Sequence, residues 1–162
     1  LMTKAVHNGF TLIELVVVIV ILGILSATAL PRFINIKPEA KTAALEAVKA
    51  SMEGASALVY GKSLIAGNQN ANPNTTPTIT LSDGTVVQTQ FGYPIRAKSL
   101  WVDLIDLSDD YTSIDTSNDG TFIVYFANDN IPSNASSPCI AYYIPPSQQG
   151  RKPRIVVNEC TE

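Results

Sequence analysis

The sequence predicts an α+β protein in which one long N-terminal helix packs against a C-terminal antiparallel β-sheet. Three observations support this prediction. An uninterrupted apolar run of helical length lies near the N-terminus, an apolar stripe with helical spacing follows it, and several strand-like segments separated by turn signals occupy the rest of the chain. A single long helix followed by a run of strands is the element order of an α+β domain.

The apolar run extends from Phe10 to Leu30 and contains one charged residue, Glu14. A helix of about 20 apolar residues spans roughly 30 Å, which matches the core of a bilayer. We therefore predict a membrane-length helix over residues 10–31, followed by a water-soluble head over residues 32–162. A carboxylate inside such a segment is costly in lipid, so Glu14 is a functional candidate that calls for a partner.

Three simpler interpretations of the apolar run fit less well. A cleaved secretory signal has an apolar region of about 7–15 residues and a small-residue cleavage site, whereas this run is longer. A plain single-pass anchor accounts for the length of the run and leaves Glu14 without a role. A buried helix of a globular protein is disfavoured because residues 15–30 are apolar all round.

The second half of the long helix is predicted over residues 39–62. Its apolar residues repeat at intervals of three and four, which places them on one helix face. They are Leu45, Val48, Met52, Ala55 and Val59. Lys49 and Glu53 are spaced to pair across one helical turn, and Gly61 and Gly67 with Asn68 provide stop signals. The stripe predicts a core face that needs a sheet to cover it.

The remainder of the chain alternates strand candidates with turns. The strand-like segments are residues 78–81, 85–90, 121–127, 139–144 and 154–158. The first two flank a Ser-Asp-Gly turn and predict a hairpin. Residues 97–107 place apolar side chains at helical spacing, so we expect a short helix there.

Composition excludes several classes of function. The 162 residues have a formal net charge of −3 and a pI of about 5.1, which disfavours a nucleic-acid binder, so no specific nucleic acid is expected as a partner. One histidine and two cysteines provide neither a structural zinc site nor much imidazole catalysis. No nucleophile–base pair or phosphate-binding glycine loop is evident. We expect no enzymatic activity, no catalytic residue and no cofactor.

Two weaker signals favour ordinary structural roles. Residues 115–120 begin like an acidic calcium loop, which makes Asp115 and Asp119 weak metal candidates. An EF-hand loop requires a glutamate at its twelfth position, which is Phe126 here, so a turn is favoured and no metal site is predicted. Residues 151–154 form a basic patch that can meet an acidic face of another subunit or an anionic surface, although a solvated loop is the simpler interpretation.

The segment ahead of the apolar run contains one lysine and no acid, and Gly9-Phe10-Thr11-Leu12-Ile13-Glu14 leads directly into the run. This arrangement resembles the leader and cleavage motif of type IV prepilins. The resemblance implies a leader over residues 1–9, cleavage by a prepilin peptidase between Gly9 and Phe10, and N-methylation of Phe10. It also implies that Glu14 pairs with the new α-amine of its own chain or of a neighbour as subunits stack.

The chain is most similar to type IV pilins of the mannose-sensitive haemagglutinin (MSHA) type. The similarity is strong over residues 1–60, and the runs at 57–62 and 91–94 support it further along. It implies the type IV pilin fold and an extended segment between Gly23 and Pro31 in the filament. Both cysteines, Cys139 and Cys160, lie outside the membrane in this topology, where an oxidising compartment favours a disulfide.

The resemblance implies a structural role as a subunit that polymerises through its N-terminal helix into a surface filament for adhesion and biofilm formation. The implied partners are other pilin subunits, the prepilin peptidase, an assembly platform with its ATPase, the inner membrane before assembly, and a surface glycan or an abiotic surface. The implied location is the inner membrane first and the extracellular pilus (fimbrium) afterwards.

Two alternatives remain open at this point. A major pseudopilin of a type II secretion system shares the signature of Gly9, Phe10 and Glu14. The second alternative is a membrane-anchored, lectin-like binding module. Its sugar site would use the aromatic rings of Trp101, Tyr142 and Tyr143, if these rings lie at the surface.

Overall fold

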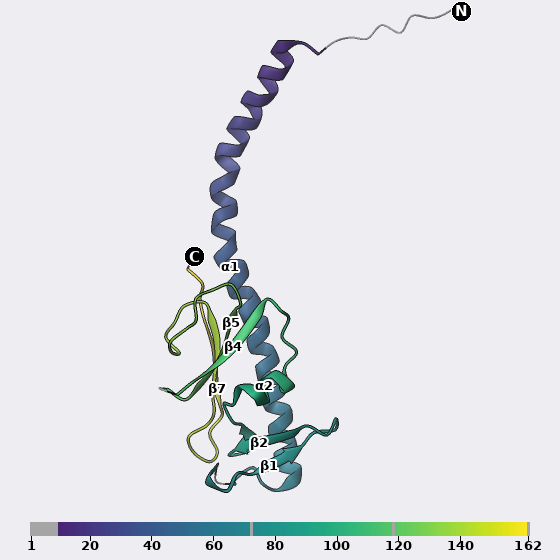
Figure 1. The fold of residues 1–162 in the computed structure, drawn as a ribbon, viewed down its shortest axis with the longest axis vertical. Helices are drawn as coiled ribbons and strands as arrows, with labels where there is room; N and C mark the ends of the chain where they lie inside the picture. The colour runs from purple at the N-terminus through teal and green to yellow at the C-terminus, as the bar shows by residue number, and fades with distance from the viewer. Residues whose placement is uncertain (1–9, 72, 118, 162) are drawn as a thin grey trace, which may run out of the picture. The chain divides into compact units, whose positions relative to one another are not determined.

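A computed structural model describes residues 10–71, 73–117 and 119–161, without the side chains of residues 30–35 and 73 (Figure 1). One long helix, α1 (Leu12–Ala66), is followed by antiparallel strands, which confirms the predicted α+β fold. The chain divides into two compact units, one ending at Lys37 and the other beginning at Pro38. Each unit is described by itself.

The part of α1 in the second unit buries the predicted apolar stripe. Leu45, Met52 and Val59 are fully buried, Val48 is nearly so, and Ala55 is half-buried. This confirms the face that the spacing of three and four indicated. The expected pair of Lys49 with Glu53 is wrong, because the Lys49 ammonium lies 3.0 Å from the carboxylate of Glu46, one turn in the other direction.

A Schellman motif ends α1 four residues later than the pattern suggested. Gly67 takes φ of 70°, and the N–H groups of Gly67 and Asn68 donate to the carbonyls of Leu64 and Ser63 at 3.1 and 3.0 Å. A residue in the left-handed region at this point favours glycine, since it lacks a Cβ. The stop signal at Gly67 and Asn68 is therefore confirmed. The stop signal at Gly61 is wrong, because α1 continues through it to Ala66.

A small three-stranded sheet follows, with strand order β1-β2-β3. Its strands are β1 (Thr78–Thr80), β2 (Val86–Gln90) and β3 (Tyr93–Pro94), and a short 3₁₀ helix (Pro73–Thr75) precedes it. The hairpin of β1 and β2 confirms the prediction from the Ser-Asp-Gly turn. Strand β3 was not predicted, because it is only two residues long and contains a proline.

The loop that joins β2 to β3 consists of Phe91 and Gly92, both with positive φ. Two such residues form the type I′ turn that matches the twist of a tight hairpin. A Cβ on Gly92 would lie 2.9 Å from the Tyr60 ring and 3.1 Å from the Gln69 Cα, so glycine also allows the loop to approach α1 closely.

A four-stranded antiparallel sheet has the order β4-β5-β6-β7. Its strands are β4 (Tyr111–Thr116), β5 (Thr121–Phe126), β6 (Ile140–Ile144) and β7 (Arg154–Asn158). The last three confirm predicted strands. Strand β4 was missed, because its sequence is rich in Thr, Ser and Asp, and the structure places Asp115 and Thr116 at its end rather than in a turn.

The main core lies between α1 and this sheet. The short helix α2 (Lys98–Leu104), which confirms the prediction over residues 97–107, inserts Trp101 against Phe122 and Tyr143. The Tyr143 hydroxyl donates to the carbonyl of Pro94 at 2.6 Å, which joins the two sheets, and burial raises the pKa of Tyr143 well above its ordinary value. The described head is therefore one packed body around the C-terminal half of α1.

Candidate functional site

The first turn of α1 is closed by a reciprocal pair of hydrogen bonds between Thr11 and Glu14. The Glu14 carboxylate accepts the backbone N–H and the hydroxyl of Thr11 at 2.9 and 2.8 Å. The Thr11 hydroxyl oxygen in turn accepts the backbone N–H of Glu14 at 3.3 Å. This is a capping box, in which a threonine at the helix N-cap and a glutamate three residues later satisfy each other's free donors. Glu14 therefore has a structural role within the single chain.

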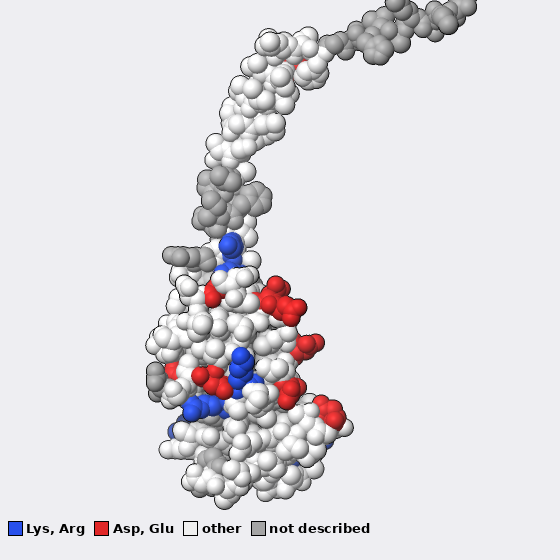
Figure 2. Space-filling view, in the orientation of Figure 1, with Lys and Arg blue, Asp and Glu red and all other residues white. Residues whose placement is uncertain are grey.

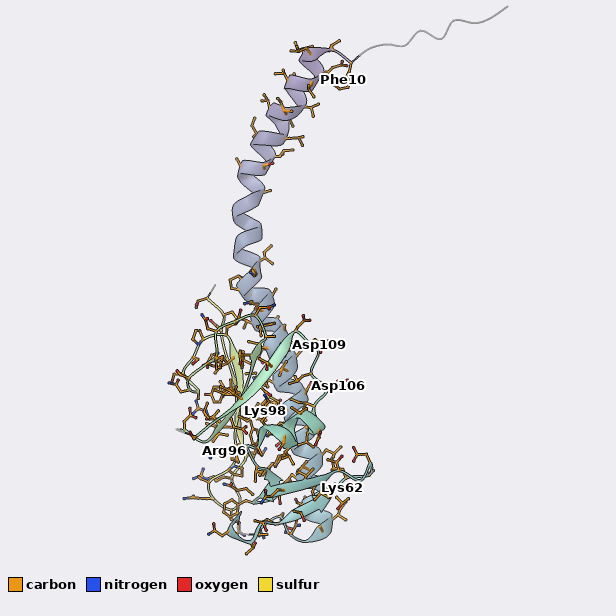
Figure 3. The ribbon with its side chains drawn as sticks, in the orientation of Figure 1. Phe10, Lys62, Arg96, Lys98, Asp106 and Asp109 are labelled. Carbon is orange, nitrogen blue, oxygen red and sulfur yellow. A yellow bond between two sulfur atoms is a disulfide. The ribbon has the colours of Figure 1, made fainter. Side chains whose placement is uncertain are left out.

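The capping box places an acid beside the residue that becomes the N-terminus if the predicted cleavage occurs. Phe10 directly precedes Thr11 and is 75% exposed just before α1 begins (Figure 3). Cleavage before Phe10 would create an α-amine next to the N–H that already binds Glu14. The two charges of the predicted pair thus lie at one helix end. Gly9 and the leader 1–9 lie outside the described residues.

The helix that follows the capping box exposes its apolar side chains on every side. Residues 12–29 have a mean hydropathy of 2.7, none of them is buried, and the segment is long and apolar enough to cross a membrane. Water makes such a surface unfavourable, since each apolar side chain gains free energy on burial. Lipid or the apolar helices of other chains are the environments that this surface fits.

The segment between Gly23 and Pro31 is helical in the single chain. Within it, the Thr28 hydroxyl donates to the carbonyls of Leu25 at 3.0 Å and Ile24 at 3.4 Å, which offers those carbonyls a bond outside the backbone ladder. A Cβ at Gly23 would meet no atom within 4 Å. The predicted extension of this segment concerns the filament and stays a prediction.

The two cysteines form a disulfide, Cys139 to Cys160, as expected from their predicted compartment. The bridge lies against the main core, where Cys160 is 7% exposed. The Cys160 N–H donates to the Thr42 hydroxyl at 3.0 Å, and that hydroxyl donates to the Pro38 carbonyl at 2.9 Å. The C-terminal segment is therefore tied both to β6 and to α1.

A second tie joins α1 to the segment that follows β5. The Lys41 ammonium lies 2.8 Å from both carboxylate oxygens of Asp129 and 5.1 Å from the centre of the Phe126 ring. Both charged side chains are largely shielded, which makes this pair stronger than an exposed one. Sequence reasoning gave no indication of it, because 88 residues separate the two partners.

The two weak metal candidates bind protein groups. Asp115 accepts the N–H of Lys98 at the start of α2 at 2.7 Å. Asp119 accepts the Thr116 hydroxyl and, at 2.8 Å, the N–H of Ala135. Within the part of the chain that the structure describes, no three His, Cys, Asp or Glu side chains gather into a metal-binding group. Both carboxylates thus fix the ends of neighbouring elements.

The three aromatic residues considered for a sugar site lie in the interior. Trp101 and Tyr143 are fully buried, and Tyr142 is 4% exposed. Trp101 is held further by its indole N–H, which donates to the carbonyl of Ile95 at 3.0 Å. These rings stabilise the head rather than line its surface.

Thr11 is the site residue that sequence reasoning missed. A Thr-x-x-Glu sequence immediately before an apolar helical run is the signature of a capping box, and residues 11–14 read TLIE. From the sequence, Glu14 was expected only to pair with the α-amine of Phe10. The same Thr-x-x-Glu pattern also indicates its hydrogen bond to Thr11. The signal was therefore present in the sequence.

Comparisons with known proteins give two partial matches. Residues 4–30 match the model of the prokaryotic N-terminal methylation motif. The chain is also 50% identical over 51 residues to the type IV narrow pilus major component PilA5 of Thermus thermophilus. That match covers 32% of this chain and 44% of the relative, so the chain aligns with less than half the length of that protein. No solved structure matches the chain.

Proposed function

We propose that this chain is a structural subunit of a type IV pilus, a pilin that polymerises through its N-terminal helix into a surface filament. The observation that supports this most is that three features occur together at the N-terminus. They are the methylation motif, the capping box of Thr11 and Glu14, and the exposed apolar helix that follows it. The similarity to a pilus component points the same way.

The proposed maturation removes residues 1–9. A prepilin peptidase cuts between Gly9 and Phe10 on the cytoplasmic side of the membrane and methylates the new amine of Phe10. The apolar segment stays on the mature chain, unlike that of a secretory signal. The mature subunit then begins one residue before its own helix cap.

The proposed topology assigns residues 10–31 to the membrane and later to the filament core, and residues 32–162 to a periplasmic head that becomes extracellular. The disulfide between Cys139 and Cys160 supports this assignment, because oxidising compartments favour such bridges. The subunit waits in the inner membrane until an assembly platform with its ATPase adds it to the growing pilus.

The proposed assembly has two physical requirements. Apolar helices that leave lipid bury against each other, so their side chains stay out of water in both states and this exchange allows assembly without driving it. Glu14 supplies direction, because a carboxylate in a low-dielectric core is stabilised by a cation at contact distance. The α-amine of Phe10, on the same chain or on a neighbour, is the cation that cleavage creates.

Within the pilins, we propose the MSHA type, with adhesion and biofilm formation on a surface glycan or an abiotic surface as the role of the filament. This assignment rests on the runs at 57–62 and 91–94 and on the bridged C-terminal segment. The same disulfide favours a pilin over a major pseudopilin of a type II secretion system, which resembles it in Gly9, Phe10 and Glu14.

Electron microscopy of fibres sheared from cells, combined with mass spectrometry of their N-terminal peptide, tests this proposal. We expect thin fibres composed of this chain, with a first peptide that begins at N-methylated Phe10. A chain that keeps residues 2–9 and remains as single molecules in the inner membrane would contradict the proposal. Fibres that appear only as short periplasmic assemblies would favour the pseudopilin.

A further inference from the structure

The charges of the head are segregated along the chain. Residues 99–150 contain seven aspartates and no lysine or arginine, and residues 151–154 then contain three cations. Charges of mixed sign are usually interspersed on a soluble surface. We therefore examined which of these charged side chains bind partners inside the head and which have no such partner.

Three of the seven aspartates have partners inside the head. Asp129 binds Lys41, Asp115 accepts the N–H of Lys98, and Asp119 accepts Thr116 and Ala135. The other four are exposed, and none of their carboxylates has a hydrogen-bond or ion-pair partner among the described residues. These four, which we call the acidic shoulder, are Asp103, Asp106, Asp109 and Asp110.

Arg151 and Lys152 lie in the loop between β6 and β7, Arg154 is the first residue of β7, and all three cations are exposed. We call Arg151, Lys152 and Arg154 the basic loop. They line an open hollow of about 350 Å³ together with prolines and polar side chains, and no carboxylate lines it. The ion pairs of the described chain, Lys41 with Asp129 and Lys49 with Glu46, involve none of the three.

Two local contacts leave the charge of the basic loop available. The Arg154 guanidinium lies 5.8 Å from the centre of the Tyr142 ring, a contact that orients the side chain without neutralising it. Glu53 and Lys152 line a common cavity but do not form an ion pair. A cluster of free cations therefore remains on a head whose other charges are mainly acidic.

The two patches lie on different edges of the head. Acidic side chains gather along the right edge in Figure 2, where Asp106 and Asp109 are labelled in Figure 3. The loop between β6 and β7, drawn in yellow-green, lies at the lower left in Figure 1. Patches of opposite sign on different edges cannot neutralise each other within one head.

We propose that the basic loop of one chain docks on the acidic shoulder of a second copy of the same chain. This proposal rests on the proposed function and adds to it the contact between heads. A contact between two different patches of one protein is heterologous, and repetition of such a contact builds an open helical assembly rather than a closed dimer. Opposite charge fixes its partner and its direction.

Carbodiimide cross-linking of sheared fibres tests the contact directly, since it joins an amine to a carboxylate only where the two touch. Lys152 is the one amine in the basic loop. We expect an amide between Lys152 and an aspartate of the acidic shoulder, formed between chains when isotope-labelled and unlabelled subunits are mixed in one fibre. Lys152→Arg keeps the charge and should abolish this cross-link. Fibres in which Lys152 joins only other carboxylates would overturn the proposal.

Charge reversal tests whether the contact stabilises the fibre. Arg151→Glu with Lys152→Glu and Arg154→Glu should lower the yield of fibres roughly tenfold at about 0.1 M salt, because several ion pairs are lost and like charges meet. Reversal of the four shoulder aspartates to lysine should do the same. Both reversals in one chain should restore most of the yield, whereas Lys62→Glu, a single reversal elsewhere on the head, should change it little.

The outcomes separate this inference from its premise. If both triple and quadruple reversals form fibres as well as the wild type, the head contact is wrong and the pilin assignment stands. If the basic-loop reversal forms normal fibres that no longer adsorb to anionic surfaces, the loop serves an external polyanion, and the proposal is overturned. If the wild-type chain forms no fibres, both the contact and the proposed function fail.

Discussion

Glu14 combines two properties that a substitution can separate. Its carboxylate closes the capping box with Thr11, and its charge is the proposed partner of the Phe10 amine. Glutamine at the same position keeps an oxygen for the Thr11 N–H and loses the charge, since a capping box accepts either residue. The pair of variants Glu14→Gln and Glu14→Ala therefore distinguishes a helix cap from an ionic contact.

We expect Glu14→Gln to be inserted and processed normally but to assemble into fibres poorly, nearly as poorly as Glu14→Ala. The measurement is the amount of sheared fibre relative to processed subunit in the membrane. Thr11→Ala is the matched control, because it weakens the cap and keeps the charge, so it should assemble far better than either variant. Normal fibres from Glu14→Gln would show that the charge has no role in assembly.

Asp119 gives the head a dependence on pH. Burial opposes ionisation, but the hydrogen bonds from Thr116 and Ala135 outweigh it and lower the pKa of Asp119 below its ordinary value of 3.8. A lowered pKa in the folded state means that the stabilisation is present above pH 3.8 and is lost as the pH falls through the folded-state pKa.

Asp119→Asn should therefore lower the free energy of unfolding at pH 7 by about 1 kcal/mol or less, since the site is exposed and solvent screens it. Chemical denaturation of the detergent-dispersed full chain at pH 7 and at pH 3 measures this. The difference between variant and wild type should shrink at the lower pH. Asp106→Asn, which removes an unpartnered carboxylate, should have little effect at either pH. A difference that is equal at both values would exclude the ionised form as the stabilising species.

At the scale of elements, the disulfide constrains the C-terminal segment covalently. Cys139 and Cys160 are separated by 21 positions, and closing a loop of this size stabilises a fold by about 3 kcal/mol in the chain-entropy model. Cys139→Ala with Cys160→Ala should lower the free energy of unfolding of the dispersed chain by about this amount, as measured with a chemical denaturant.

Two controls define that result. The intact chain should show no free thiol before unfolding, and reduced wild type should lose about as much stability as the double variant. Because Thr42 and Lys41 also tie this region to α1, we expect the reduced head to remain folded. If the double variant forms fibres normally although its head is much less stable, the disulfide stabilises the head and has no role in assembly.

Local signals determined most of these elements. The stripe from Leu45 to Val59, the hairpin turn at residues 82–84 and the continuous apolar run of β5 are each specified within a few residues, so the sequence alone predicts them. Strand β4 is different. Its Thr, Ser and Asp residues have little strand pattern of their own, and it forms because it pairs along its whole length with β5.

At the scale of the whole molecule, the same contrast applies to the sites. The proposed assembly site is contiguous in sequence, so residues 9–14 indicate it without a structure, and the spacing of residues 11 and 14 also indicates the role of Thr11. The tie between Lys41 and Asp129 depends on partners far apart in the chain, and the separation of acidic shoulder and basic loop depends on which aspartates the fold uses internally. Only the folded structure shows this ion pair and this separation of charge.

The segment from Gly23 to Pro31 is expected to change its conformation only when subunits assemble into a filament. In the single chain it is helical, although Pro31 has no N–H to donate and the Thr28 hydroxyl already binds two nearby carbonyls. When subunits pack, an extended chain over the seven residues 24–30 would lengthen the N-terminal apolar segment by roughly 13 Å. An extended residue rises about 3.3 Å, whereas a helical residue rises 1.5 Å.

We therefore expect a cryo-electron microscopy map of the fibre to show α1 interrupted over residues 24–30, with the helix resuming after Pro31. Pro31→Ala restores the missing donor, and so it should favour an unbroken helix and give fibres that extend less under force. Ala27→Ser, a polar change inside the same segment that restores no backbone bond, is the matched control and should leave the interruption in place. A wild-type map with continuous helix through residues 24–30 would exclude the extension, and the weak points at Gly23 and Pro31 would then serve only to bend the helix.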